Sequence, residues 1–314
     1  MKIAVVGAGG VGGYFGAMLA RSGTDVTFIA RGAHLAALKE KGLLIENTKG
    51  ENLCLDRVQA TDDPAMVGPV DLVLFAVKLP DSETAVRALR PLFGPRTAIV
   101  SFQNGVQKDD LLRREFGNEA VMGGVAYISA FIARPGVIRH VGGMGRLVFG
   151  EFDGHRSPRA LAFLEACQQA GFDIELAEDI RRRIWEKFVL LVGLSAATAS
   201  MRMPVGPIRE NPLTRQFLLD LMQETAAVGR ALGVALPDGY AEDRLEFTRK
   251  FPPTMTASMC HDLEEGKPLE VMWLSGAVVD LGRQAGVATP ANRAVRDILV
   301  LHAQGRSAPA AASH

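Results

Sequence analysis

A chain of 314 residues exceeds the size at which one hydrophobic core usually stops growing, which predicts two domains. With 48% hydrophobic and 22% charged residues, the composition excludes a disordered or fibrous protein. The 35 basic and 35 acidic residues cancel, so the chain as a whole has no attraction for nucleic acid or an anionic membrane, and any anion must be recognised locally.

The first half alternates short apolar runs with helical stretches. Strands are expected at residues 3–6, 26–29, 72–77, 98–101, 121–133, 137–150 and 172–176, and helices at 12–22, 34–41 and 81–92. The first four strands are apolar along nearly their whole length, which is typical of strands covered on both faces. Strands that alternate with helices imply right-handed crossovers and a parallel sheet. The first half is therefore predicted to be an α/β domain.

From about Asp179 onward the strand signal fades and helix starts replace it. These starts are Asp179, Asn211-Pro212, Pro268 and Thr289-Pro290. The helix opened by Pro268 is expected to end at Gly286. We therefore expect residues 1–178 to form the first domain and residues 179–314 to form an all-helical second domain, with 305–314 as a frayed tail.

The cysteines and apolar segments favour a cytoplasmic protein. Cys54, Cys167 and Cys260 lie far apart and form no C-x-x-C pair, which argues against disulfides and structural zinc. The N-terminal apolar run is shorter than a secretory signal, and residues 188–201 are too short to span a bilayer. The spacing of the histidines (His34, His140, His155, His261, His302) predicts no metal site. The basic run 181–183 has no interleaved aromatic residues, so it predicts a solvated helix face and not a nucleic-acid site.

A glycine-rich turn follows the first expected strand. Its sequence, Gly7-Ala8-Gly9-Gly10-Val11-Gly12, fits the pattern G-x-G-x-x-G and opens a helix. Gly7 permits a tight turn, Gly9 lets the backbone approach a pyrophosphate, and Gly12 allows the helix to pack closely on the strand. The helix N-terminus adds N–H donors and a positive dipole. The context predicts a dinucleotide site, although a glycine-rich turn without a ligand has the same local sequence.

The end of the second strand indicates which dinucleotide is bound. NAD sites usually place an acidic residue there for the ribose 2′-hydroxyl, whereas this strand ends in Ala30-Arg31. A guanidinium pairs with a 2′-phosphate, so Arg31 favours NADP; the alternative is a solvated surface arginine. Lys78 and Asn104 follow the next two strands, at the edge where ligands bind in parallel sheets. A loop lysine and a turn at Asn104-Gly105 are the alternatives.

Lys187 is the candidate proton donor. Reduction of a ketone requires a hydride and a group that protonates the oxygen. Lys187 precedes the apolar run 188–194, and apolar surroundings lower the pKa of a lysine toward neutrality, as a general acid requires. From position alone, an ordinary lysine at the head of a buried helix is the alternative. Structural roles explain the next two candidates as well as a role in the site does. Glu270 is then a first-turn acid that stabilises the helix dipole, and Ser258 is a helix cap.

Several motifs together resemble those of the ketopantoate reductase (2-dehydropantoate 2-reductase) family, over nearly the whole chain. They are GAGGVGGYFGAMLARSG, Val77-Lys78, Gln103-Asn104-Gly105-Val106, Trp185-Glu186-Lys187-Phe188, Ser258-Met259, Glu270, residues 276–286 and Thr289-Pro290. The ordered set of Lys, Asn-Gly, Lys, Ser and Glu is much more specific than the glycine motif alone.

The resemblance implies a Rossmann domain followed by a helical domain, with the active site in the cleft between them. Lys187 would protonate the carbonyl oxygen while NADPH gives hydride, and Glu270 would orient the lysine or the substrate hydroxyl. Ser258 would help to hold the carboxylate, and Asn104 would bridge cofactor and substrate. The resemblance further implies that Lys78 and Arg31 contact NADPH.

The sequence departs from the family at two positions. The family often has asparagines four and eight residues after its lysine, where this chain has Leu191 and Ser195. Leucine forms no hydrogen bonds, and serine reaches less far with one donor. Because a lost polar partner changes substrate preference by orders of magnitude, a more apolar, branched 2-oxo acid is as reasonable a substrate as ketopantoate.

Three hypotheses follow. The leading one is a 2-dehydropantoate 2-reductase making pantoate for pantothenate synthesis. The second is a reductase of the same fold that acts on another small 2-oxo acid, and the third is a non-catalytic NADP-binding sensor. A homodimer is the suggested oligomeric state, because helical second domains with apolar surfaces often pair.

Overall fold

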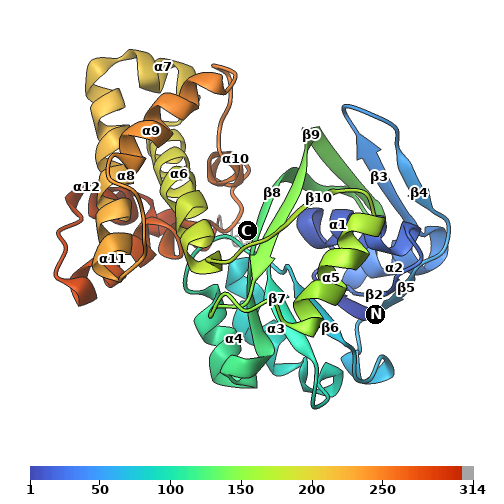
Figure 1. The fold of residues 1–314 in the computed structure, drawn as a ribbon. Coiled ribbons are helices and arrows are strands. Elements are labelled where there is room, and N and C mark those ends of the chain that lie inside the picture. Colours follow the sequence, from blue (N-terminus) through green and yellow to red (C-terminus); the bar gives the residue numbers. More distant parts are fainter. Residues whose placement is uncertain (306–314) are drawn as a thin grey trace, which may run out of the picture. The chain divides into compact units, whose positions relative to one another are not determined.

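The computed structural model describes residues 1–305, and the chain divides into two compact units (Figure 1). The first consists of Met1–Asn104 and Lys108–Arg183, and the second of Gly105–Gln107 and the chain from Ile184 onward. The division after Arg183 lies a few residues beyond the boundary expected at 178. Of the expected frayed tail 305–314, all but Gly305 lies outside the described residues.

One sheet forms the centre of the first unit. Its strands are β1 (Lys2–Val6), β2 (Asp25–Ile29), β3 (Leu43–Asn47), β4 (Leu53–Leu55), β5 (Gln59–Thr61), β6 (Leu72–Phe75), β7 (Ala98–Ser101), β8 (Val121–Arg134), β9 (Val137–Gly150) and β10 (Asp173–Leu176). The order is β4-β3-β9-β8-β7-β6-β1-β2-β5, and β10 also pairs with β9. All neighbours from β8 to β5 are parallel, whereas β8–β9 and β3–β4 are antiparallel. The expected parallel arrangement therefore holds for the strands from β8 to β5 of a mixed sheet.

Both faces of the parallel strands are buried, as their apolar sequences predict. On β1, Ile3 and Val5 belong to one hydrophobic core, whereas Ala4 and Val6 belong to another. The first core includes residues of α1 (Gly10–Arg21), α2 (Gly32–Lys41) and α5 (Pro158–Gln169). The second includes residues of α3 (Ser82–Arg87) and α4 (Lys108–Phe116). The helices thus cover the two faces of the sheet separately (Figure 1).

The second unit is helical throughout its described residues. Its α-helices are α6 (Ile180–Met201, whose first turn belongs to the first unit), α7 (Val205–Glu210), α8 (Pro212–Ala231), α9 (Tyr240–Phe247), α10 (Ser258–Glu264), α11 (Ser275–Ala285) and α12 (Pro290–Leu299). Short 3-10 turns of this unit lie at Thr248–Lys250, Glu270–Met272 and Val300–His302. Those of the first unit lie at Pro64–Met66, Leu79–Asp81, Arg90–Leu92 and Asn118–Ala120. The predicted fold class, a Rossmann domain followed by a helical domain, is confirmed.

Helix α6 lies in the core of the second unit. Trp185, Phe188 and Val192 are almost completely buried there, together with side chains of α8 and α11. Among the described residues α6 is the one helix long and apolar enough to cross a membrane. However, 67% of its apolar 18-residue stretch is buried inside the protein. Such burial is typical of a core helix. The helix that contains the apolar run 188–201 begins at Ile180, next to the start expected at Asp179.

The expected helix starts are mostly confirmed. The Asp179 carboxylate accepts a hydrogen bond from Arg182 N at 2.9 Å, and Asn211 caps α8 through the N–H groups of Leu213 and Thr214. Helix α12 begins at Pro290 as predicted, without a side-chain cap from Thr289.

The predicted start of a helix at Pro268 was wrong. A 3-10 turn at Glu270–Met272 comes first, and α11 begins only at Ser275. The N–H of Leu269 donates to the carbonyl of Ala303, which ties this segment to the chain after α12 and prevents a continuous helix. The predicted end is confirmed, since Gly286 has a left-handed φ of 71°.

Residues 105–107 belong to the second unit, although the chain on both sides of them belongs to the first. Val106 packs against the hydrophobic core that α6, α8 and α11 share. The chain returns to the first unit at Lys108. The loop after Asn104 is therefore part of both halves of the protein.

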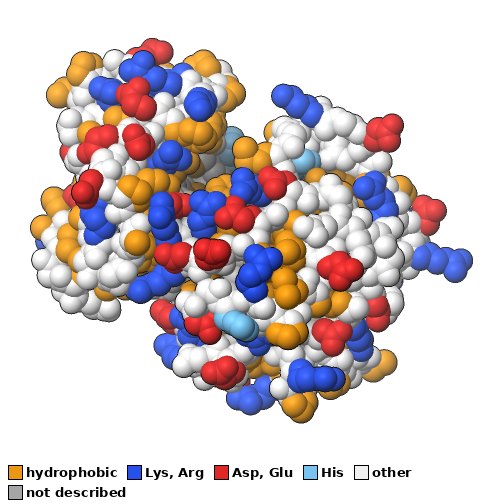
Figure 2. All heavy atoms as spheres, viewed as in Figure 1, with side chains coloured by type: hydrophobic (Ala, Val, Ile, Leu, Met, Phe, Trp, Pro, Cys, Tyr) orange, Lys and Arg blue, Asp and Glu red, His pale blue; other side chains and the backbone are white. Residues whose placement is uncertain are grey.

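On the face drawn in Figure 2, basic and acidic side chains are intermixed. This distribution agrees with the equal numbers of the two kinds of residue in the sequence. Anion recognition must therefore come from local groups, and strand ends and helix starts are where such groups occur.

Candidate functional site

Four parallel strands bring the expected cofactor residues to one edge of the sheet. Gly7 follows β1, Arg31 follows β2, Lys78 follows β6 and Asn104 follows β7. These strands are neighbours in the order β7-β6-β1-β2, so their carboxyl ends meet. Arg31 and Lys78 are exposed, and Asn104 is half-buried. The sheet thus assembles these residues where parallel sheets bind ligands.

The glycine turn has the geometry that a dinucleotide requires. Gly7 has a φ of +93°, and a Cβ there would lie 2.6 Å from Val77 N. A Cβ on Gly12 would lie 2.2 Å from the carbonyl oxygen of Gly7, so only glycine lets α1 approach β1 this closely. Around Gly9, in contrast, a Cβ would meet no heavy atom within 4 Å. The turn is closed on its strand side and open at Gly9, so a pyrophosphate fits there.

Gly10 has a different neighbour from the one that the motif suggests. A Cβ on Gly10 would lie 2.0 Å from the carbonyl oxygen of Ala130 in β8. The β8–β9 hairpin therefore packs its backbone directly against the start of α1. Ala8 is buried and Val11 is half-buried beside this contact. The motif alone gave no sign of the hairpin, because that contact joins segments far apart in the sequence.

Gln103 joins the two strand ends that carry Lys78 and Asn104. Its side-chain amide donates to Val77 O at 2.8 Å and to Ser82 Oγ at 2.6 Å. Its side-chain oxygen accepts a hydrogen bond from Ser101 Oγ at 3.0 Å. Gln103 is only 8% exposed, so these bonds are shielded from water. This buried amide fixes the two loops relative to each other, a role that the sequence reasoning missed.

A buried ion pair holds the other end of the Asn104 loop. Lys108 Nζ donates to the carbonyl of Ser101 at 2.8 Å and to Asp109 Oδ1 at 3.0 Å. Burial lowers the pKa of Lys108 and raises that of Asp109, while the charge of each partner opposes these shifts. Because a buried charge is tolerated only when paired, this contact constrains the loop between residues 101 and 108. Nothing in the sequence indicated that the pair is buried.

Helix α6 carries three of the expected residues on one stripe. Lys187 and Leu191 are half-buried, above core residues such as Phe188 and Val189. Ser195 is completely buried, and its Oγ has no hydrogen-bond partner among the described residues. A buried hydroxyl without a partner is costly, and a ligand group or a water would satisfy it. The expected substrate contact of Ser195 stays a prediction.

Ser258 and Glu270 are held by the core of the same unit. The Thr198 hydroxyl of α6 accepts a hydrogen bond from Ala257 N at 3.3 Å, directly before Ser258, which is exposed at the first position of α10. Glu270 is half-buried between Leu269 and Val271, which are both fully buried. These contacts fix the backbone that carries each side chain.

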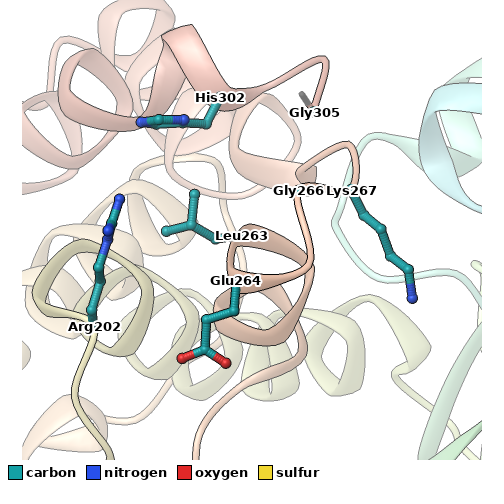
Figure 3. Close-up of a pocket in the computed structure, with 7 residues that line it drawn as sticks. All are labelled: Arg202, Leu263, Glu264, Gly266, Lys267, His302 and Gly305. Atoms are coloured by element: carbon teal, nitrogen blue, oxygen red, sulfur yellow. The ribbon is translucent and has the colours of Figure 1, made fainter. Parts of the chain in front are cut away.

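The second unit also contains a pocket of about 230 Å³ (Figure 3). It is lined by Arg202, Leu263, Glu264, Gly266, Lys267, His302 and Gly305. In Figure 3 Arg202 and His302 point toward each other, whereas Lys267 extends away from them. Lys267 forms an ion pair with Glu265. None of the expected site residues lines this pocket, so it is not the predicted substrate site.

One of the histidines that the sequence analysis set aside has both a side-chain amide partner and a backbone partner. His140 bonds to Asn47 Oδ1 and to the carbonyl of Met144, each at 2.9 Å. Among residues 1–305, no group of three or more His, Cys, Asp or Glu side chains is arranged to hold a metal ion.

Comparison with protein families identifies the whole chain. A family model described as ketopantoate reductase PanE/ApbA matches residues 3–154, and the model of its C-terminal domain matches residues 179–302. The chain belongs to the ketopantoate reductase family. The resemblance seen in the motifs is thereby confirmed, and the protein is an oxidoreductase of a nicotinamide-dinucleotide-dependent family.

Similar proteins cover nearly the full length. A 2-dehydropantoate 2-reductase of Mesorhizobium japonicum is 33% identical over 94% of this chain and 95% of its own. The crystal structure of a 2-dehydropantoate 2-reductase from Geobacter metallireducens is 33% identical, with a TM-score of 0.89 over 96% of this chain and 99% of that one. A D-mandelate dehydrogenase solved with NADH and anilino(oxo)acetate shares the fold at 21% identity, with a TM-score of 0.86 over 96% and 98% of the two chains.

Proposed function

We propose that this reductase converts 2-dehydropantoate to pantoate with NADPH, a step of pantothenate biosynthesis. The observation that carries the proposal is Lys187, half-buried two turns into helix α6 and directly before its apolar part, in a member of this family. Ketopantoate reduction is supported by relatives of that name at about one-third identity. A cytoplasmic location is part of the same proposal, and the three free cysteines support it.

Each proposed residue has a distinct chemical task. Bound NADPH supplies the hydride. The ammonium of Lys187 donates a proton to the substrate oxygen as the carbonyl carbon becomes tetrahedral, so that one hydride and one proton convert C=O to CH–OH. Ser258 donates a hydrogen bond to the substrate carboxylate, and Glu270 orients Lys187 or the substrate hydroxyl. Asn104 bridges cofactor and substrate.

NADP specificity is proposed from Arg31. The residue is exposed at the end of β2, before α2, where the 2′-position of the adenosine ribose is recognised in this fold. Lys78 adds a second positive charge at the same edge. Arg31→Ala is therefore expected to weaken NADPH binding by about tenfold or more while changing NADH binding little, because only NADPH carries the 2′-phosphate. Titration of both dinucleotides tests this, and an equal loss for both would refute a phosphate contact.

Leu191 and Ser195 favour a second candidate, a reductase of a more apolar 2-oxo acid. Neither position offers the amide that would bind a hydroxylated substrate. The D-mandelate dehydrogenase of the same fold is an example of a different substrate on this architecture. NADPH oxidation with 2-dehydropantoate and a panel of branched and aromatic 2-oxo acids decides between them by kcat/KM. Turnover of none of these acids would favour a non-catalytic NADP sensor.

The oligomeric state stays a prediction. A homodimer is the state we expect, and analytical ultracentrifugation of the purified protein tests it.

A further inference from the structure

His34 joins the glycine turn to the turn between β8 and β9, whose Gly136 lies 102 positions after His34 in the sequence. Its Nε2 lies 2.9 Å from the carbonyl oxygen of Ala8 in the glycine turn. Its Nδ1 lies 3.1 Å from the N–H nitrogen of Gly136, in the turn between β8 and β9. The side chain is half-buried in the first turn of α2, just after Arg31. An imidazole with both nitrogens occupied between two loops is a structural link.

The two partners determine the tautomer. The N–H of Gly136 can only donate, so Nδ1 accepts; the carbonyl of Ala8 can only accept, so Nε2 carries the hydrogen. The ring is therefore neutral. Burial lowers the pKa of His34, which favours the same neutral form.

Holding the Ala8 carbonyl also orients the next amide. The C=O of Ala8 and the N–H of Gly9 belong to one peptide group, and in a trans peptide they point in opposite directions. Because the carbonyl is directed to His34, the Gly9 N–H is directed to the opposite side. Gly9 is the position of the turn that borders open space. Backbone N–H groups at this point of a Rossmann turn are donors to a pyrophosphate.

The rest of the turn is braced by backbone contacts. Gly7 N donates to the carbonyl of Ile29 at 3.1 Å, and Gly13 N donates to the carbonyl of Gly9 at 2.7 Å. Gly10 lies against the backbone of Ala130. The Ala8–Gly9 peptide lies between these braces, and His34 provides its link to α2 and to the hairpin.

We propose that His34 is a positioning residue for the dinucleotide pyrophosphate, acting through the Ala8 carbonyl to fix the Gly9 amide as a phosphate donor. The proposal rests on the proposed function only in that the ligand is a nicotinamide dinucleotide. His34 itself touches neither the reacting atoms nor the phosphate.

Two substitutions separate the two hydrogen bonds. In His34→Gln, the side-chain NH₂ can replace Nε2 and donate to Ala8, but nothing accepts from Gly136. In His34→Asn, the side-chain oxygen can replace Nδ1 and accept from Gly136, but nothing reaches Ala8. Each variant loses one bond, so both are expected to lower the melting temperature of the ligand-free protein to a similar degree.

Only the Asn variant is expected to lose dinucleotide affinity. NADPH titrated by calorimetry into the intact protein should bind His34→Asn about tenfold more weakly than wild type, the effect of one lost hydrogen bond, and His34→Gln within about threefold. At saturating NADPH, kcat of His34→Asn should match that of wild type, because Lys187 is unaffected. His140→Gln is the matched control: it lowers stability and leaves the Kd for NADPH unchanged.

The outcomes are distinguishable. Wild-type affinity in His34→Asn, or equal losses of affinity in the Asn and Gln variants, would overturn the role of His34 and leave the proposed function intact. If the wild-type protein bound neither NADPH nor NADH, the proposed function would fall together with this inference.

Discussion

The two units carry proposed site residues of different kinds. In the first unit the groups proposed to face a ligand belong mainly to the backbone, at the glycine turn and at the ends of β1, β2, β6 and β7. In the second unit the proposed groups are single side chains, Lys187, Ser258 and Glu270, carried by separate helical segments over a buried core. A backbone site depends on which positions are glycine and on what lies behind them. A side-chain site depends on the chemical identity of each residue.

This contrast explains why the cofactor is better defined than the substrate. The turn around Gly7 to Gly12 tolerates few alternatives, because Cβ atoms at Gly7, Gly10 or Gly12 would collide with backbone. On α6, this chain has Leu191 and Ser195 where the family often has asparagines. Such a replacement is compatible with the helix and its packing, but it changes which substrate groups the helix can bind. The fold can therefore keep its redox chemistry and change its substrate.

The largest effect is expected at Lys187. Lys187→Ala should reduce kcat about 1000-fold, the usual contribution of a general acid, and leave the Kd for NADPH nearly unchanged. Stopped-flow turnover and a separate binding titration measure the two quantities. Lys267→Ala, which removes an exposed lysine of the same unit, is the control and should have wild-type kcat. Unchanged turnover in Lys187→Ala would remove this residue from the mechanism.

Adjacent glycines test the claim that the first unit is a backbone site. Gly10→Ala should lower the free energy of unfolding by about 2 kcal/mol, because the new Cβ would collide with the Ala130 carbonyl in β8. Gly9→Ala should change stability by less than about 0.5 kcal/mol, since Gly9 has a φ of −79° and open space around it. It should nevertheless weaken NADPH binding about tenfold, by keeping the phosphate away from the backbone.

Urea unfolding and NADPH titration of both variants give the comparison. A large loss of stability in Gly9→Ala, or none in Gly10→Ala, would contradict the packing described for the turn.

The smallest effect is expected at Leu191. Leu191→Asn should raise the ratio of kcat/KM for 2-dehydropantoate over a branched 2-oxo acid without a hydroxyl group by about tenfold, because the amide can bond to the hydroxyl. Leu191→Ala separates this gain from the loss of bulk and should leave the ratio nearly unchanged. If both variants shift the ratio equally, volume and not hydrogen bonding selects the substrate at this position.

The long apolar strands and the capped helices were predictable from the sequence. Residues 98–101 form β7 with the predicted bounds, and Asp179 and Asn211 cap helices as expected, because these signals are local. The strands β3, β4 and β5 were missed, because they are only partly buried and lack the continuous apolar run of strands such as β7. The predicted helix over 81–92 is instead α3 followed by a 3-10 turn that contains Pro91.

The residues that support the candidate site were harder to predict than those expected to contact ligand. Gln103, Lys108 and His34 act through hydrogen bonds to distant or buried backbone, at Val77, Ser101 and Ala8 respectively. No sequence pattern encodes such pairs, because the partner is a carbonyl that every residue has. The sequence analysis set His34 aside because the spacing of the histidines predicts no metal site. In the structure one of its partners is the glycine turn itself.

The short excursion at residues 105–107 has a consequence for protein engineering. The core of the helical unit packs against Val106, which comes from a segment that lies more than seventy positions before α6 in the sequence. A chimera that exchanged only the C-terminal half between two relatives would therefore pair a foreign Val106 equivalent with a core that evolved around another side chain. Recombination designs for this architecture should transplant that tripeptide together with the helices.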